Sequence, residues 1–90
     1  MAQEKQKISY SKDKLGSIEK NLILFNDEFN TFDYVIETLI DICGHEPLQA
    51  EQCALITHYK GKCSVKSGGF AELKPIHDEM SRRNLSVEID

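Results

Sequence analysis

Residues 21–33 read NLILFNDEFNTFD, and the stretch changes character abruptly between Phe25 and Asn26. The short apolar run that ends at Phe25 is bounded by polar residues, which predicts a buried strand of the kind covered on both faces. Asn26, Asp27 and Glu28 follow the strand directly, and a new apolar pattern begins four residues later. A solvated turn is the commoner explanation of such a cluster, and a receptor for a cation is the alternative.

Length and charge limit the possible functions. The 90 residues are enough for one small domain, and too few for a large enzyme with a deep cleft. Fifteen acidic residues against 11 basic ones give a net charge of -4, which disfavours nucleic acid as a partner. No apolar run approaches the ~20 residues of a membrane span, and the N-terminus lacks the apolar core of a secretory signal. We therefore expect a cytoplasmic protein without a membrane partner.

Two helices are predicted on the C-terminal side of the opening stretch. Thr31 can cap a helix that begins at Phe32 and ends before Gly44, because its hydroxyl can accept a bond from a free amide of the first turn. Pro47 suits the first position of a second helix, where its missing N–H has no effect, and Gly61 ends that helix.

The C-terminal third predicts a strand, a helix and a strand. Residues 63–65 alternate in polarity, and the Ser-Gly-Gly turn at residues 67–69 ends that strand. Apolar residues at three- and four-residue steps predict a helix over residues 70–80, which Pro75 should kink near its start. Strict alternation predicts a last strand over residues 85–89.

These elements define a single compact α+β domain, in which a small three-stranded antiparallel sheet packs against three helices. Residues 19–90 form this predicted core. Residues 1–18 are polar with isolated apolar side chains, too few to offset the entropy of ordering them, and we expect a flexible, disordered tail.

The three cysteines predict neither a disulfide framework nor a common zinc motif. Cys43, Cys53 and Cys63 are odd in number and contain no C-x-x-C pair, so we interpret them as small buried apolar side chains. His45 and His58 lie nearby in the sequence, which leaves open a zinc site assembled by folding and, with it, a small metal-dependent enzyme. We expect no metal and no cofactor.

Three segments together resemble a known family. They are the strand that ends in Asn-Asp-Glu, the helix that contains YVIETL at residues 34–39, and the segment HYKGKC at residues 58–63. They resemble ClpS, the adaptor that presents N-degron substrates to Clp ATP-dependent proteases, and the resemblance runs from about Asn21 to Ile89. The paired motifs are fairly specific at this distance, whereas either half alone is weak.

The resemblance implies a peptide-binding site. Asn26 and His58 correspond to residues that bind the free α-amino group of a substrate, and Asp27 to the acid that supports it. Glu28 and Asn30 would lie at the entrance for the peptide. The chemistry is consistent, because an ammonium group offers three donors and a charge to an amide oxygen, an unprotonated imidazole and a carboxylate. The positions that match the apolar pocket for the first side chain are Phe32, Val35, Ala54, Thr57 and Leu85.

The resemblance also implies that a partner performs the chemistry. The N-terminal domain of a Clp AAA+ unfoldase would bind this adaptor, and no motif here places a nucleophile beside a base, so we expect a monomeric binding protein that is not an enzyme. A general protein-docking module of related fold, without recognition of terminal residues, is the alternative. Ala54 stands where the family often has a bulky Met, which leaves the preferred first side chain open.

Overall fold

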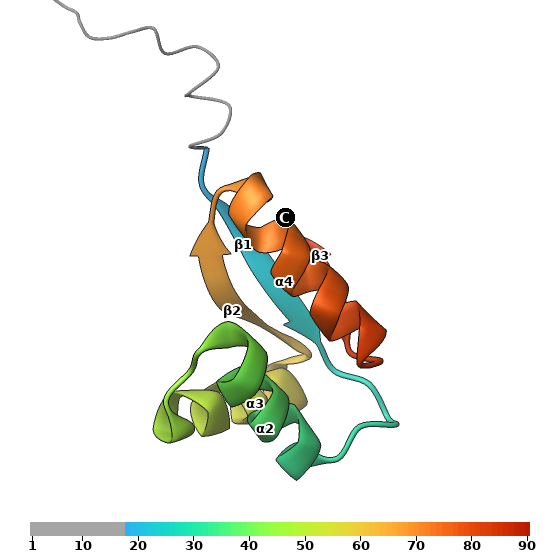
Figure 1. Ribbon diagram of the computed structural model, residues 1–90. Helices are drawn as coiled ribbons and strands as arrows, with labels where there is room; N and C mark the ends of the chain where they lie inside the picture. Colours follow the sequence, from blue (N-terminus) through green and yellow to red (C-terminus); the bar gives the residue numbers. More distant parts are fainter. Residues whose placement is uncertain (1–17) are drawn as a thin grey trace, which may run out of the picture.

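The computed structural model describes residues 18–90, so the predicted tail lies outside the described residues except for Ile18. The order of the elements is the predicted one, with three strands and three helices among the described residues (Figure 1). The elements are β1 (Lys20–Phe25), α2 (Phe32–Cys43), α3 (Pro47–Lys60), β2 (Lys62–Gly68), α4 (Phe70–Arg82) and β3 (Ser86–Ile89). The predicted α+β class is confirmed.

The sheet is antiparallel, and β1 is its central strand in the order β2-β1-β3. Leu22 and Leu24 of β1 are 0% and 1% exposed, whereas Ile23 and Phe25 are only half-buried. The prediction of a strand covered on both faces is therefore wrong. The helices cover one face, and the apolar residues on the other face are shielded only partly.

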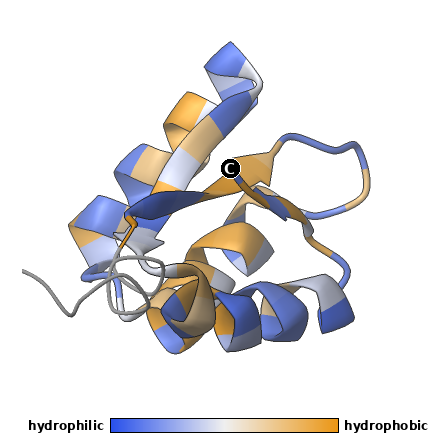
Figure 2. Ribbon diagram, turned by 90° about the horizontal axis from the view of Figure 1, so that it is seen from above, coloured by the Kyte–Doolittle hydropathy of each residue, from blue (hydrophilic) through white to orange (hydrophobic). Residues whose placement is uncertain are grey.

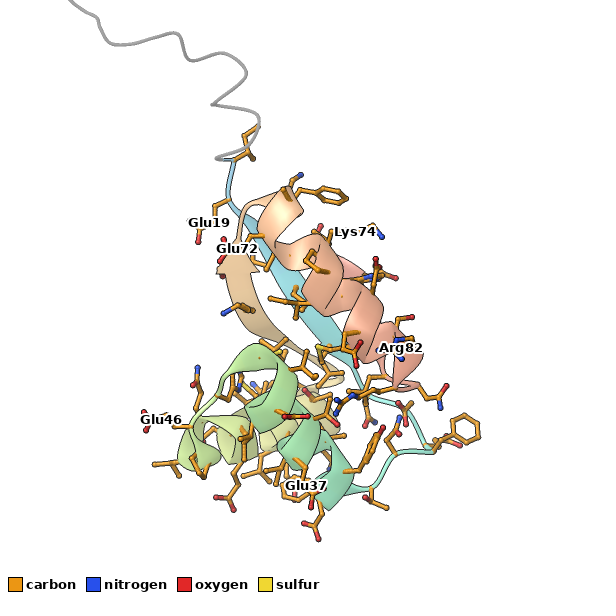
Figure 3. The ribbon with its side chains drawn as sticks, in the orientation of Figure 1. Glu19, Glu37, Glu46, Glu72, Lys74 and Arg82 are labelled. Carbon is orange, nitrogen blue, oxygen red and sulfur yellow. The ribbon has the colours of Figure 1, made fainter. Side chains whose placement is uncertain are left out.

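Helix α4 lies along the sheet and contacts all three strands, while α2 and α3 pack on each other beside β2 (Figure 1). In Figure 2 the helices and the strands both show a mixture of hydrophilic and hydrophobic residues, as amphipathic elements around one core should. The charged residues labelled in Figure 3 are exposed and lie on the outside of the fold. The buried core consists of Leu22, Leu24, Leu39, Cys43, Ala50, Val65, Leu73, Met80 and Leu85.

Local signals set the helix ends as predicted. The hydroxyl of Thr31 accepts a bond from the backbone N–H of Tyr34 at 3.1 Å and so caps α2. Pro47 occupies the first turn of α3. Gly44 and Gly61 end α2 and α3 with φ angles of 71° and 96°, a left-handed conformation that glycine adopts without the steric cost of a Cβ.

Strand β2 is longer than predicted and contains a bulge. It continues through Gly68 because Ser67 pairs with Asn21, whose side-chain oxygen accepts bonds from the hydroxyls of Ser64 and Ser67 at 3.1 and 2.7 Å. The pairing shifts between Leu22 and Ile23, which leaves Val65 as the extra residue.

His45, which is 5% exposed, contacts this bulge. The Nε2 atom of His45 lies 2.6 Å from the carbonyl oxygen of Val65, a hydrogen-bonding distance. Because a buried carbonyl needs a partner, the imidazole stabilises the bulge and joins the α2–α3 connection to the sheet. His45 therefore has a structural explanation that does not involve a metal.

Pro75 does not interrupt α4, which continues from Phe70 to Arg82. The proline lies in the second turn and removes one backbone donor, but the apolar side of the helix stays buried at Leu73 and Met80. Within residues 18–90, no helix is long and apolar enough to cross a membrane.

Candidate functional site

A cavity of about 310 Å³ opens where β1 ends, at the lower end of the range of ligand pockets, about 300–1,000 Å³. The structure brings together in its lining all the residues that the sequence assigned to the site. They are Asn26, Asp27, Glu28, Asn30, Phe32, Val35, Ala54, Thr57, His58 and Leu85. Leu24 and Phe25 also line the cavity and were not predicted, because the sequence shows them only as members of a buried strand.

Backbone pairing brings the two halves of the site together. Phe25 pairs with Lys62, and the N–H of Asn26 donates to the carbonyl of Gly61 at 2.9 Å. The N–H of Gly61 in turn donates to the backbone carbonyl of Thr57 at 2.9 Å, and this bond closes the last turn of α3. His58 lies in that turn, so the end of β1 and the end of α3 meet at one edge of the cavity.

Asp27 orders the loop that follows β1. Its Oδ1 accepts bonds from the backbone N–H groups of Phe29 and Asn30, both at 2.8 Å, and its Oδ2 accepts one from the Asn30 side chain at 2.8 Å. Burial raises the pKa of this carboxyl, but the bonds from Asn30 and Phe29 favour the charged form and leave the pKa below its ordinary value. Asp27 is therefore ionised at neutral pH and places a negative charge at the rim.

The side chains of Asn26 and His58 have acceptors available to a ligand. Both residues are exposed, and neither side chain makes a hydrogen bond within residues 18–90. The imidazole of His58 packs edge-to-face against the ring of Tyr59, with 4.8 Å between the ring centroids. The rim thus presents an amide oxygen and an imidazole nitrogen beside the Asp27 charge.

The floor of the cavity is mostly apolar. Ala54, Thr57 and Leu85 are 3%, 5% and 4% exposed, and Val35 is half-buried. The hydroxyl of Thr57 donates to the Cys53 carbonyl at 2.8 Å, so its proton is satisfied within α3. Phe32 lies at the mouth, where it also borders a second hollow of about 340 Å³ formed with Leu55, His58 and Tyr59.

None of the three cysteines is among the described residues that line this cavity. Within residues 18–90, no group of three or more His, Cys, Asp or Glu side chains is arranged to hold a metal ion. Cys43 is buried with its Sγ 3.5 Å from the sulfur of Met80, and burial raises the pKa of its thiol to about 11. Cys53 and Cys63 are half-buried, so the prediction of three buried cysteines holds only for Cys43.

The arrangement is suited to binding one kind of group. A rim of acceptors that includes the carboxyl groups of Asp27 and Glu28 matches a primary ammonium, and the apolar floor matches a hydrocarbon side chain attached close to it. An amino acid at the start of a polypeptide has both features on a single carbon atom.

Curated relatives match about 60% of the chain. The ATP-dependent Clp protease adapter protein ClpS of Sodalis glossinidius is 33% identical over 58 residues, which cover 62% of this chain and 55% of the relative. The protein of the same description from Edwardsiella ictaluri is 38% identical over 56 residues, covering 60% of this chain and 53% of the relative. The chain spans about half the length of these relatives.

The fold and the family also agree. The structure of Agrobacterium tumefaciens ClpS2 bound to L-phenylalaninamide matches with a TM-score of 0.68, over 80% of this chain and 94% of that chain, at 14% sequence identity. That likeness shows a shared fold. The family described as "ATP-dependent Clp protease adaptor protein ClpS" matches residues 19–87. Because this match covers most of the chain, the protein belongs to the ClpS family of adaptor proteins.

Proposed function

We propose that this protein binds the free α-amino group and the bulky apolar first residue of N-degron proteins, and delivers them to the N-terminal domain of a Clp AAA+ unfoldase for degradation. The observation that carries this proposal is the cavity that joins Asn26, Asp27 and His58 at its rim to an apolar floor. Each of the two parts recognises one feature of a terminal residue.

The rim provides selectivity for a free N-terminus. An α-amino group has a pKa of about 8, so it is largely an ammonium at neutral pH, with three N–H donors. Asn26 and His58 each offer an acceptor without a partner among the described residues, and Asp27 supplies the opposite charge. An acylated terminus loses two of the donors and the charge.

The floor provides selectivity for the first side chain. Burying a Leu or Phe side chain contributes about 1.5–3 kcal/mol, and a hydrogen bond to a charged group contributes about as much. The apolar term and three such hydrogen bonds sum to at most about 12 kcal/mol, and an association cost of about 4 kcal/mol leaves roughly -8 kcal/mol, which is micromolar-order binding. At that affinity the loss of either part weakens binding measurably.

Two comparisons support this ligand class. The Agrobacterium tumefaciens protein of the same fold has been solved with L-phenylalaninamide, which combines a free α-amino group with a benzyl side chain. The family description names an adaptor of an ATP-dependent Clp protease, which agrees with a binding protein that is not itself an enzyme. The alternative, a docking module of related fold without terminal-residue recognition, predicts no dependence on the first residue.

A peptide series tests the proposal. Peptides that differ only in the first residue are titrated against the full chain, with Leu, Phe, Ala and Asp at that position. Leu and Phe should bind at micromolar concentrations, and Asp should not bind, because its carboxylate would be buried unpaired in the floor. Equal binding of all four peptides would favour the docking module.

Delivery is tested separately with a folded reporter protein that carries Leu or Met as its first residue. The adaptor should accelerate degradation of the Leu reporter by a Clp unfoldase and its protease. The His58→Ala variant should abolish that acceleration. Acceleration by the variant equal to that of the native chain would show that delivery does not use this cavity.

A further inference from the structure

The connection between α4 and β3, residues 83–85, carries one residue of the cavity wall and is bonded to side chains of the β1–α2 loop and of α2. Leu85 is 4% exposed and lines the cavity directly before β3 begins. Asn84, just before it, has a φ angle of 71°, the one left-handed non-glycine residue among those described. The position of the Leu85 side chain therefore depends on a tight turn with an unusual backbone conformation.

Two side chains hold consecutive carbonyl groups of this turn. The hydroxyl of Tyr34, in the first turn of α2, donates to the carbonyl of Arg83 at 3.0 Å. The side-chain amide of Asn30 donates to the carbonyl of Asn84 at 2.9 Å. Asn30 lies in the β1–α2 loop, which carries part of the polar rim, and Tyr34 lies in the helix that follows; both are more than 40 residues from the turn in the sequence.

The same amide group of Asn30 also bonds to Asp27. Its distance to the carboxylate of Asp27 is 2.8 Å, so Asn30 links the ammonium-binding rim to the turn that carries Leu85. The guanidinium of Arg83 lies 3.0 Å from the carboxylate of Asp41 in α2 and 3.2 Å from that of Glu79 in α4. These contacts join α2 and the end of α4, which lie near the β1–α2 loop in Figure 1.

We propose that Tyr34 and Asn30 are positioning residues that set the Leu85 wall of the pocket and so determine how tightly a large first side chain fits. The inference rests on the proposed function, because it assigns that wall to the first residue of the substrate. Tyr34 does not line the cavity, so it acts through the turn and not by touching the ligand. Leu85 itself is held on the other side by its N–H, which donates to the Met80 carbonyl at 3.1 Å.

The Tyr34→Phe variant separates positioning from simple stability. It removes one hydroxyl and keeps the ring of a side chain that is 36% exposed, so folding should be preserved. A peptide that begins with Phe reaches the Leu85 wall, whereas one that begins with Ala does not. The ratio of the two affinities should fall by roughly two- to tenfold, the scale of one hydrogen bond, while the Ala peptide binds as before.

Ser67→Ala is the matched control. Its hydroxyl bonds to Asn21 at 2.7 Å, at the end of the sheet remote from the cavity, so its loss should leave the ratio unchanged. A Tyr34→Phe variant that weakens both peptides equally, or neither, would overturn the proposal. If the native chain binds no free-amine peptide, the proposed function fails and this inference fails with it.

A second pair of variants tests the backbone of the turn. Asn84→Gly and Asn84→Ala both remove the side chain, but only Gly adopts a φ near 71° without steric cost. The affinity ratio of the Phe and Ala peptides should stay native in Asn84→Gly and fall in Asn84→Ala. Circular dichroism checks that both variants are folded, and equal ratios in the two folded variants would contradict control of the pocket by this turn.

Discussion

The backbone N–H of Asn26 donates to the carbonyl of Gly61 at 2.9 Å, and this bond joins the end of β1 to the end of α3. Asn26 and His58 are separated in the sequence by all of α2 and most of α3, yet they border one cavity. Gly61 makes the junction possible, because its φ angle of 96° turns the chain from α3 directly into β2. The spacing of the polar rim therefore depends on one glycine.

Replacing this glycine should weaken binding as well as folding. A Cβ at Gly61 meets nothing within 4 Å, so Gly61→Ala costs only the left-handed conformation, about 1–2 kcal/mol. Gly44→Ala is the control, since Gly44 has a φ of 71° and equally open surroundings but ends α2 and accepts no bond from Asn26. Urea unfolding should show a similar decrease in the free energy of unfolding for both variants. Peptide titration should show weaker binding only for Gly61→Ala. Equal affinities in the two variants would mean that the Asn26–Gly61 junction does not set the rim.

Binding should require an acceptor at position 58. His58→Gln keeps a neutral acceptor, so it should bind a Leu peptide within about tenfold of the native affinity, whereas His58→Ala removes the acceptor and should bind about tenfold more weakly or worse. Titration of the same peptide against the three proteins measures this. Equal affinities of the native protein and His58→Ala would remove His58 from the site.

The loop that carries the rim should lose stability in acid because of Asp27. The pKa of Asp27 is lower in the folded protein than its ordinary value, so its contribution is complete above that ordinary value, about 4, and is lost as the pH falls through the folded pKa. The free energy of unfolding should be larger for the native protein than for Asp27→Asn at pH 7, and the difference should shrink at pH values below about 4. Urea unfolding of both proteins at pH 7 and below about pH 4 measures this difference. A difference that does not change with pH would show that the charge of Asp27 does not order the loop.

Ala54 should admit branched first residues. It is 3% exposed, lines the cavity and lies four residues before His58, so both side chains share one side of α3. A Met at this position would crowd the β-carbon of the bound residue and exclude Ile and Val. The native chain should thus discriminate against Ile and Val less than Ala54→Met does, by about 1–2 kcal/mol, the scale of one or two methylene groups. If Phe32, which is 39% exposed at the mouth, rotates inward, it would fill the space beside Ala54. The ratio of Leu to Ile affinity would then be the same in the native chain and in Ala54→Met, which would contradict the prediction.

The sequence predicted the features that depend on neighbouring residues. Thr31, Gly44, Pro47 and Gly61 fix helix ends through local capping and backbone conformation, and the structure has helix ends at all of them. The bulge at Val65 was not predictable in this way, because it depends on the pairing of two strands and on a bond from His45, twenty residues away. The extension of β2 past residue 66 likewise depends on Asn21 in another strand.

The candidate site was likewise predicted only in part. The resemblance of two short motifs selected residues that the structure places in one lining, although neither motif alone shows that they meet. Leu24 and Phe25 were missed because an apolar side chain in a strand has the same pattern whether it faces the core or a cavity. The bond from Tyr34 to the Arg83 carbonyl spans 49 residues and involves a backbone acceptor, so no side-chain pattern indicates it.

Recognition of a free N-terminus is the central claim, and one pair of peptides tests it most directly. A peptide that begins with Phe and its N-acetylated form are titrated against the native chain by calorimetry at about pH 7.5, where an α-amino group is still mostly charged. The free peptide should bind at micromolar concentrations, and the acetylated one should bind at least about a hundredfold more weakly, because it lacks the charge and the donors that Asn26, Asp27 and His58 receive. Equal affinity of the two peptides would contradict the claim.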